Sequence, residues 1–147
     1  MIHVQEADFN LQTEYEALRK QSNGIGAICS FVGLMRDFND GDNVAGMFLE
    51  HYPGMTEKAL QKIADEAMQR WPLINYRIIH RVGPLQPNDQ IVLVLVASAH
   101  RQAAFAACEF IMDFLKTRAP FWKKELTQQG EKWVDAKASD DDAAQRW

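Results

Sequence analysis

Cysteine is scarce in this sequence of 147 residues. Only Cys29 and Cys108 are present, far apart in the chain and each among apolar neighbours. Because there is no CxxC pair, neither a zinc knuckle nor a thioredoxin-like redox relay is indicated, and we expect two buried structural thiols. His51 and His80 have no carboxylate or cysteine at ligand spacing, so we predict no metal site and no resident cofactor.

Long apolar runs and an excess of positive charge are also missing. The longest strongly apolar run, 91–97, is far shorter than the ~20 residues that a membrane-spanning helix needs. The first ten residues carry acids and lack an apolar core, so we expect no signal peptide and a cytoplasmic location. The net charge of −4 argues against a nucleic-acid partner.

Three common nucleotide-site and nucleophile motifs are absent. The sequence contains no GxSxG, no GxxxxGK[ST] and no GxGxxG, and Gly24-Ile25-Gly26 is only a fragment of the last. The composition, 47% hydrophobic and 24% charged, is ordinary for a globular protein. Its size predicts a single domain over 1–147 with a substantial aromatic core.

The periodicity of apolar residues predicts a mixture of strands and helices. A strand over 90–98 is apolar on both faces, as in a central, covered strand. Helices are predicted over 11–20, over 56–71 with Thr56 as N-cap, and from about His100 to about Ala119, where Pro120 ends the helix. Further strands are predicted over 2–7, 24–34, 44–52 and 74–82, with a polar loop over 36–43 and a turn over 84–89.

The residues from 121 onward are predicted to form a hairpin and a docked terminus. The segments 121–126 and 132–136 read as two strands that turn at Gln129-Gly130. An acidic tail follows, and we expect the terminal Trp147 to dock on a neighbouring surface. Since strands and helices do not alternate strictly, we predict an α+β fold.

Lys116 is the first candidate for chemistry. At 100° per residue it shares a helix face with Phe105, Glu109 and Met112. Burial and nearby cations favour the neutral amine, which can act as base or nucleophile. The alternative is a solvated lysine that pairs with Asp113 at i,i+3.

Basic residues cluster around this helix end and at its start. Four cations in nine residues suggest an anion site, although such a run is also typical of a solvated face: Lys116, Arg118, Lys123 and Lys124. His100 and Arg101 open the helix, where free N–H groups favour a phosphate or carboxylate, unless His100 is only a capping residue. Arg36 follows a strand and suits bidentate anion contacts, but a lone loop arginine often has no such role.

Several sequence blocks resemble the large, catalytic subunit family of the molybdopterin synthases. The most specific are EHYPGMTEKAL (50–60) and LKTRAPFWKKE (115–125). The others are FVGLMRDFNDGD (31–42), IHRVGPLQPND (79–89), SAHRQAAFAACEFIMDF (98–114) and the closing WVDA and RW.

The resemblance implies a fold and a reaction. The expected fold is an α/β-hammerhead-type sheet with packed helices and a small antiparallel β-subdomain around 121–137. The expected reaction is sulfur transfer to cyclic pyranopterin monophosphate (precursor Z), giving molybdopterin for molybdenum cofactor biosynthesis. The expected sulfur donor is the thiocarboxylate on the C-terminal Gly-Gly tail of a small ubiquitin-like subunit, in a heterotetramer built on a homodimer of this chain.

The resemblance also assigns roles to individual residues. Lys116 would meet the thiocarboxylate carbon and assist transfer, and Lys123 would assist proton transfer at the pterin. The positions that match substrate-binding and pocket-lining residues are Arg36, His100, Arg101, Phe31 and Met112. An 18-residue helix is about 27 Å long, so its two ends cannot easily serve one site. We therefore expect His100 and Arg101 to reach the pocket of the other subunit.

Two other functions stay open from the residues alone. A non-catalytic module could use the basic, aromatic hairpin to capture an anionic peptide tail. An enzyme acting on a phosphate ester could work without any partner. Because the chain has no redox-paired cysteine, a sulfur transferase of this composition must receive its sulfur from elsewhere, and a partner's thiocarboxylate meets that need.

Overall fold

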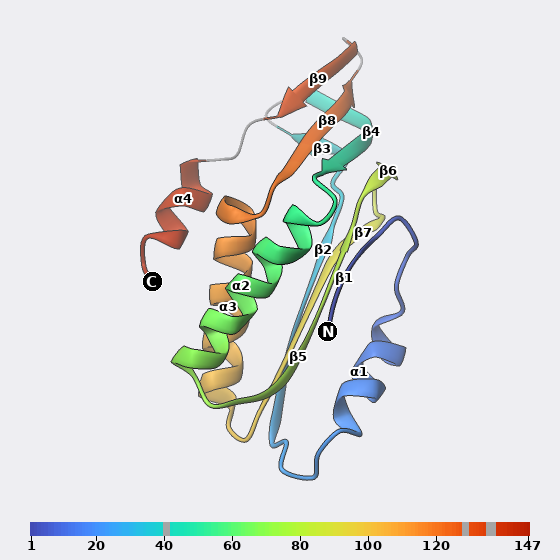
Figure 1. Cartoon of the computed structure of the whole chain (residues 1–147). Coiled ribbons are helices and arrows are strands. Elements are labelled where there is room, and N and C mark those ends of the chain that lie inside the picture. The colour runs from blue at the N-terminus through green and yellow to red at the C-terminus, as the bar shows by residue number, and fades with distance from the viewer. Residues whose placement is uncertain (40–41, 128–129, 135–137) are drawn as a thin grey trace.

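Two β-sheets and four helices make up the described part of the chain, residues 1–39, 42–127, 130–134 and 138–147 of a computed structural model (Figure 1). The helices are α1 (Leu11–Arg19), α2 (Met55–Arg70), α3 (Arg101–Arg118) and α4 (Ala138–Ala144). The strands are β1 (Ile2–Gln5), β2 (Ala27–Leu34), β3 (Phe38–Asn39), β4 (Asp42–His51), β5 (Leu73–Arg81), β6 (Gly83–Leu85), β7 (Gln90–Ser98), β8 (Phe121–Thr127) and β9 (Gly130–Val134). The predicted α+β class is confirmed.

The first sheet has the strand order β1-β5-β7-β2, and helices cover both of its faces. Val92, Val94 and Val96 of the central strand β7 pack with buried residues of α2 and α3. Leu93 and Leu95 point to the other face, where α1 contributes Leu18. This arrangement confirms the prediction that 90–98 forms a central strand covered on both sides.

The second sheet has the order β3-β4-β8-β9, with β6 paired to β4, and lies beyond one end of the first (Figure 1). The predicted hairpin is present as β8 and β9, although 128–129 and 135–136 lie outside the described residues. Strand β8 also pairs along β4, with His51 opposite Phe121 and Leu49 opposite Lys123. The hairpin is therefore joined to the body of the fold by a full strand.

Three short elements differ from the sequence prediction. The expected loop 36–43 holds β3 and the start of β4, and Asn39 pairs with Asp42 across positions 40–41, which lie outside the described residues. The expected turn 84–89 includes most of β6, which β4 holds in place. The expected acidic tail contains α4, a helix of seven residues that packs along α3.

Helix α2 begins one residue earlier than predicted, and Thr56 is not its N-cap. The N-cap is Gly54, whose φ of 86° is a conformation that glycine adopts without strain. Glu57 accepts a hydrogen bond from the Gly54 amide at 2.5 Å. Thr56 is instead fully buried, with its hydroxyl between Tyr52 and Pro120.

Glycines allow a close backbone approach within β2 and just before it. A Cβ on Gly26 would lie 2.1 Å from the Ala99 carbonyl oxygen, and one on Gly33 would lie 2.8 Å from Val92. Both positions therefore require the absence of a side chain.

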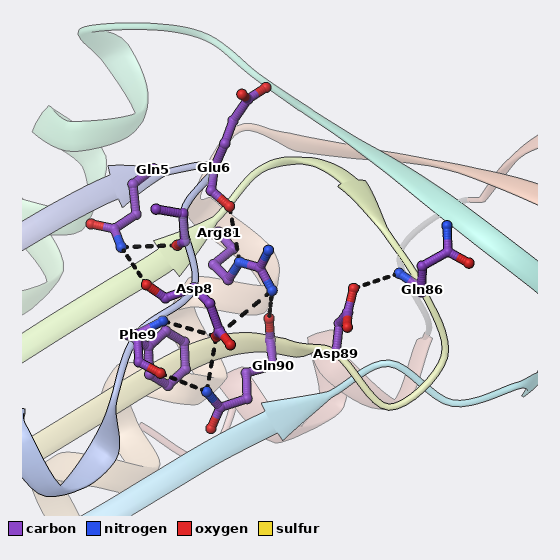
Figure 2. A network of polar contacts seen from close by, with 9 residues as sticks. Gln5, Glu6, Asp8, Phe9, Arg81, Gln86, Asp89 and Gln90 are labelled. Carbon is purple, nitrogen blue, oxygen red and sulfur yellow. Dashed lines mark hydrogen bonds and ion pairs between the residues drawn. The ribbon is translucent and has the colours of Figure 1, made fainter.

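A polar network fixes the end of β5 near the start of α1 (Figure 2). Arg81 donates through Nε to the Glu6 carbonyl and through Nη1 to the Gln90 carbonyl, each at 3.0 Å. Gln90 donates to Asp8 at 2.9 Å and to the Phe9 carbonyl at 2.8 Å. The bond from Gln90 lowers the pKa of the Asp8 carboxyl. The network ties the β1–α1 connection to β5 and β7.

Candidate active site

A pocket of about 260 Å³ opens where the C-terminal end of α3 meets both sheets. Helix α3 ends at Arg118, and Ala119 has the extended backbone (ψ 133°) expected before a proline. The chain then enters β8, so Lys116 and Lys123 lie on either side of this break and both line the pocket. Other lining residues include Phe31, Arg36, Met35, Leu115, His80, Phe121, Glu125 and Asp140.

Lys116 does not form the ion pair with Asp113 that the alternative interpretation expected. Within the described ranges of the chain, no ion pair of Lys116 is seen, and its side chain is exposed at the pocket. Asp113, its possible partner at i,i+3, accepts hydrogen bonds from Arg146 at 2.9 Å and from Trp147 at 2.6 Å. Lys123 is half-buried.

His80 is a pocket residue that the sequence analysis did not select. It alternates with Tyr76 and Ile78 on the face of β5 that packs against α3, and only 5% of it is exposed. Its ring stacks on Phe121 with centroids 3.8 Å apart and an interplanar angle of 18°. A polar residue on the otherwise apolar face of an alternating strand is the signal that could have identified it.

The ring of His80 is held neutral. Burial is the main cause that lowers the pKa of His80 to about 3; the bond to the Arg81 carbonyl opposes this shift, and the nearby charges of Lys116, Lys123 and His51 contribute to it. Nδ1 lies 2.8 Å from that carbonyl oxygen, which can only accept, so Nδ1 carries the proton. Nε2 is then the ring's hydrogen-bond acceptor.

Acidic side chains balance part of the positive charge in the pocket. Glu125 follows Lys123 by two residues on β8 and is 4% exposed, and Asp140 reaches the pocket from α4. Neither was selected from the sequence, although Glu125 closes one of the two most specific blocks. Two amines, a guanidinium and apolar walls together suit an anionic ligand with a flat or apolar part.

The structure does not bring all predicted site residues together. His100 and Arg101 are exposed at the start of α3. The helix has 18 residues and is about 27 Å long at 1.5 Å per residue, and Lys116 lies near its other end. His100 is the N-cap residue of α3, as the alternative interpretation expected, but its side chain makes no capping hydrogen bond. Met112 is packed in the core beneath the helix and is not among the residues that line the pocket.

The two cysteines lie away from the pocket. Cys108 is buried and Cys29 is half-buried, so the expectation of two buried thiols holds fully only for Cys108. Burial, and then the neighbouring Cys29 thiol, raise the pKa of Cys108. Neither thiol lines the pocket.

Two negative findings apply to the described ranges. Within them, no three His, Cys, Asp or Glu side chains are grouped so that they could hold a metal ion. In the same ranges, no helix has both the length and the apolar character needed to cross a membrane.

Known proteins similar to this chain share both its sequence and its fold. The family model described as MoaE protein matches residues 4–118. A molybdopterin synthase catalytic subunit from Pseudomonas aeruginosa is 64% identical over 146 residues, 99% of this chain and 97% of the relative. The same-named protein of Escherichia coli is 55% identical over 139 residues, 95% of this chain and 92% of the relative.

A solved structure of a MoaE protein has the same fold as this chain. The molybdopterin biosynthesis MoaE protein from Burkholderia ambifaria is 58% identical and superposes with a TM-score of 0.87, over 100% of this chain and 97% of that one. The match to the family model and these identities over nearly the whole length have one explanation: the chain belongs to the MoaE protein family.

Proposed function

We propose that this chain is the catalytic subunit of a molybdopterin synthase, which converts precursor Z to molybdopterin by sulfur transfer. The observation that carries the proposal is the pocket at the α3–β8 break, where Lys116 and Lys123 open onto one cavity with Arg36. The names of the close relatives support the same reaction.

The sulfur comes from outside the chain, as a thiocarboxylate on the C-terminal Gly-Gly tail of a small ubiquitin-like subunit. Two points support this donor. Among the described residues, no cysteine lines the pocket, so no thiol of this chain is placed to supply the sulfur. The relatives are named catalytic subunits, and that name implies an enzyme with at least one further subunit.

The pocket residues have distinct roles in the proposed reaction. Arg36 binds the phosphate of the pterin, an anion that suits a guanidinium. Lys116 meets the thiocarboxylate carbon, where the carbon–sulfur bond breaks and an oxygen from water replaces the sulfur. Lys123 assists proton transfer to the oxygen that leaves the pterin side-chain carbon as the new carbon–sulfur bond forms there. Phe31 forms an apolar wall for the ring system.

His100 and Arg101 act from a second copy of the chain. His100, Arg101 and their helix start lie too far from Lys116 to share its pocket within one chain. We place them at the pocket of the partner in a homodimer, with a small subunit at each end. Met112 packs one turn before Lys116 and supports the wall from below.

Substitution of the two lysines tests the function. Lys116→Ala and Lys123→Ala are each expected to lower product formation about a hundredfold or more, because a group positioned for covalent or proton transfer is removed. The assay mixes precursor Z with thiocarboxylated small subunit, and binding of the small subunit is measured in parallel. Lys124→Ala is the matched control, since its amine pairs with Glu131 at 2.8 Å away from the pocket.

The outcomes separate this function from its alternatives. Retained partner binding with lost turnover supports catalysis by the lysines. Normal turnover by both variants contradicts the proposed mechanism. Loss of partner binding in both would favour a non-catalytic tail-binding module, and turnover by the isolated chain without a partner would favour a phosphate-ester enzyme.

A further inference from the structure

The last two residues of the chain bind to α3 one turn before Lys116. Arg146 donates through Nη2 to Glu109 at 2.7 Å and to Asp113 Oδ2 at 2.9 Å. The indole Nε1 of Trp147 donates to the same Asp113 oxygen at 2.6 Å. We call Arg146 and Trp147 the C-terminal latch.

The latch is held by packing as well as by these polar bonds. The Trp147 ring lies edge-on to Trp71 and Phe110, with centroids 5.6 and 5.7 Å apart. Arg70 donates to the Trp147 carbonyl at 2.9 Å. Buried aromatic contacts of this kind order a chain end that would otherwise be mobile. The position of the latch on Asp113 is therefore fixed by α2 and α3 together.

Asp113 is the carboxylate best placed to bind Lys116. Residues at i and i+3 of a helix are surface neighbours, and opposite charges at this spacing attract. The Asp113 side chain is only 14% exposed, so water screens its charge incompletely. Even so, Lys116 forms no ion pair within the described part of the chain, and both latch donors take Asp113 Oδ2.

Other charged and titratable groups also face the pocket that Lys116 lines. Lys123 and Glu125 come from β8, Arg36 follows β2, Asp140 comes from α4 and the neutral His80 from β5. None of these carboxylates lies on α3 within one turn of Lys116. Asp113 does, and it is the one that the C-terminal latch occupies.

We propose that Arg146 and Trp147 are positioning residues that hold Asp113 away from Lys116, so that the lysine amine stays directed into the pocket. This inference rests on the proposed function, in which Lys116 acts on the thiocarboxylate. An amine paired with a carboxylate is turned out of the pocket and is harder to deprotonate. Occupying the carboxylate with two other donors removes both effects.

The test removes the two donors and keeps the packing. Arg146→Met with Trp147→Phe frees Asp113 while a ring stays between Trp71 and Phe110. An opposite charge within about 4–6 Å raises the pKa of a lysine amine by at least about one unit. The fraction of neutral Lys116 at pH 7, and with it kcat, should therefore fall roughly tenfold. The KM for precursor Z should change little, and the loss should become smaller as the pH is raised.

Rescue separates positioning from a general loss of structure. Adding Asp113→Asn to the released variant removes the competing charge and should restore most of the lost kcat. Arg146→Met alone leaves the indole bond and the docked ring, and should give a smaller loss that Asp113→Asn also reverses. Arg70→Ala is the matched control, because it weakens the latch without freeing Asp113, and its kcat should stay near the wild-type value.

A second readout does not depend on the reaction. Labelling of Lys116 by an amine-reactive acylating reagent, followed by peptide mass spectrometry, should be slower in the released variant and recover with Asp113→Asn. If labelling and kcat are unchanged in the released variant, or if Asp113→Asn restores neither, the inference is wrong. If labelling follows the expected pattern but the wild type does not convert precursor Z, the proposed function fails and the positioning role stands.

Discussion

A single buried histidine places an uncharged group among the lysines of the pocket. His80 is 5% exposed, and burial lowers its pKa to about 3. Protonation would put a buried positive charge beside Lys116 and Lys123. The folded state therefore favours the neutral ring, and protonation of His80 lowers the free energy of unfolding.

This titration predicts how stability depends on pH. The unfolded chain binds a proton at His80 below about pH 6.5, whereas the folded chain does so only near pH 3. The contribution of His80 to the free energy of unfolding is therefore present above pH 6.5 and is lost as the pH falls toward 3. Between pH 7 and 5 the wild type should lose about 2 kcal/mol from this residue. His80→Phe, which can keep the stacking on Phe121, should lack that component.

Urea unfolding of both proteins at pH 5, 6 and 7 measures the effect. The variant is expected to be less stable at pH 7, and the gap between the two proteins should narrow by about 2 kcal/mol at pH 5. Other titrating groups are common to both proteins and cancel in the comparison. Parallel pH profiles would show that His80 is not the group responsible.

Of the seven predicted site residues, four meet in one pocket, whereas His100, Arg101 and Met112, which also lie in a block that resembles the family, do not. Phe31, Arg36, Lys116 and Lys123 lie in blocks that resemble the family, and all four line one pocket. His80 also lies in such a block, but its role comes from the α3 face above it and from Phe121 beside it. Contacts between β5, α3 and β8, which are distant in the sequence, cannot be predicted from the spacing of residues within each element.

Among the elements, the break between α3 and β8 sets the distance between the two lysines, and α2 supports it. Thr56 lies in the first turn of α2 and is fully buried. Its hydroxyl accepts from the Tyr52 amide at 3.0 Å and donates to the Pro120 carbonyl at 3.2 Å. One side chain thus joins the end of β4, the start of α2 and the entry to β8.

Removing this hydroxyl should loosen the break. Thr56→Val keeps the shape but leaves the Tyr52 amide and the Pro120 carbonyl without their partner, which should cost about 1–3 kcal/mol of unfolding free energy. Because the entry to β8 carries Phe121 and Lys123, turnover should also fall. Thr56→Ser keeps the hydroxyl and is the control for both measurements. Equal stability of the Val and Ser variants would mean that the two hydrogen bonds do not support the break.

Long periodic elements were predictable, and the short ones were not. The bounds of α2, α3, β5 and β7 follow from hydrophobic period and from Pro72 and Pro120, which act locally. The pairs β3–β4 and β4–β6 form only because β4 is already in place, so their own residues carry little signal. Helix α4 is short and acidic, and it packs on α3 beside the docked Trp147.

For the whole molecule, the predicted site residues lie at opposite ends of α3, too far apart to form one site within a single chain. Lys116 lies at the C-terminal end in a pocket, whereas His100 and Arg101 lie exposed at the N-terminal end. A helix start with free amide groups and an arginine suits a phosphate. A twofold dimer would place each helix start at the other chain's pocket and give two equal composite sites.

Complementation between two inactive variants tests this arrangement. Lys116→Ala and Arg101→Ala should each be nearly inactive as homodimers if both residues serve one site. When the two variants are co-expressed in equal amounts with different tags, half of the dimers contain one copy of each variant. One of the two sites in such a mixed dimer is intact, so about a quarter of wild-type activity should return. Purification through both tags should enrich this fraction to about half. If mixed dimers form but stay inactive, Lys116 and Arg101 serve the same chain's site or separate functions, and the composite site is wrong.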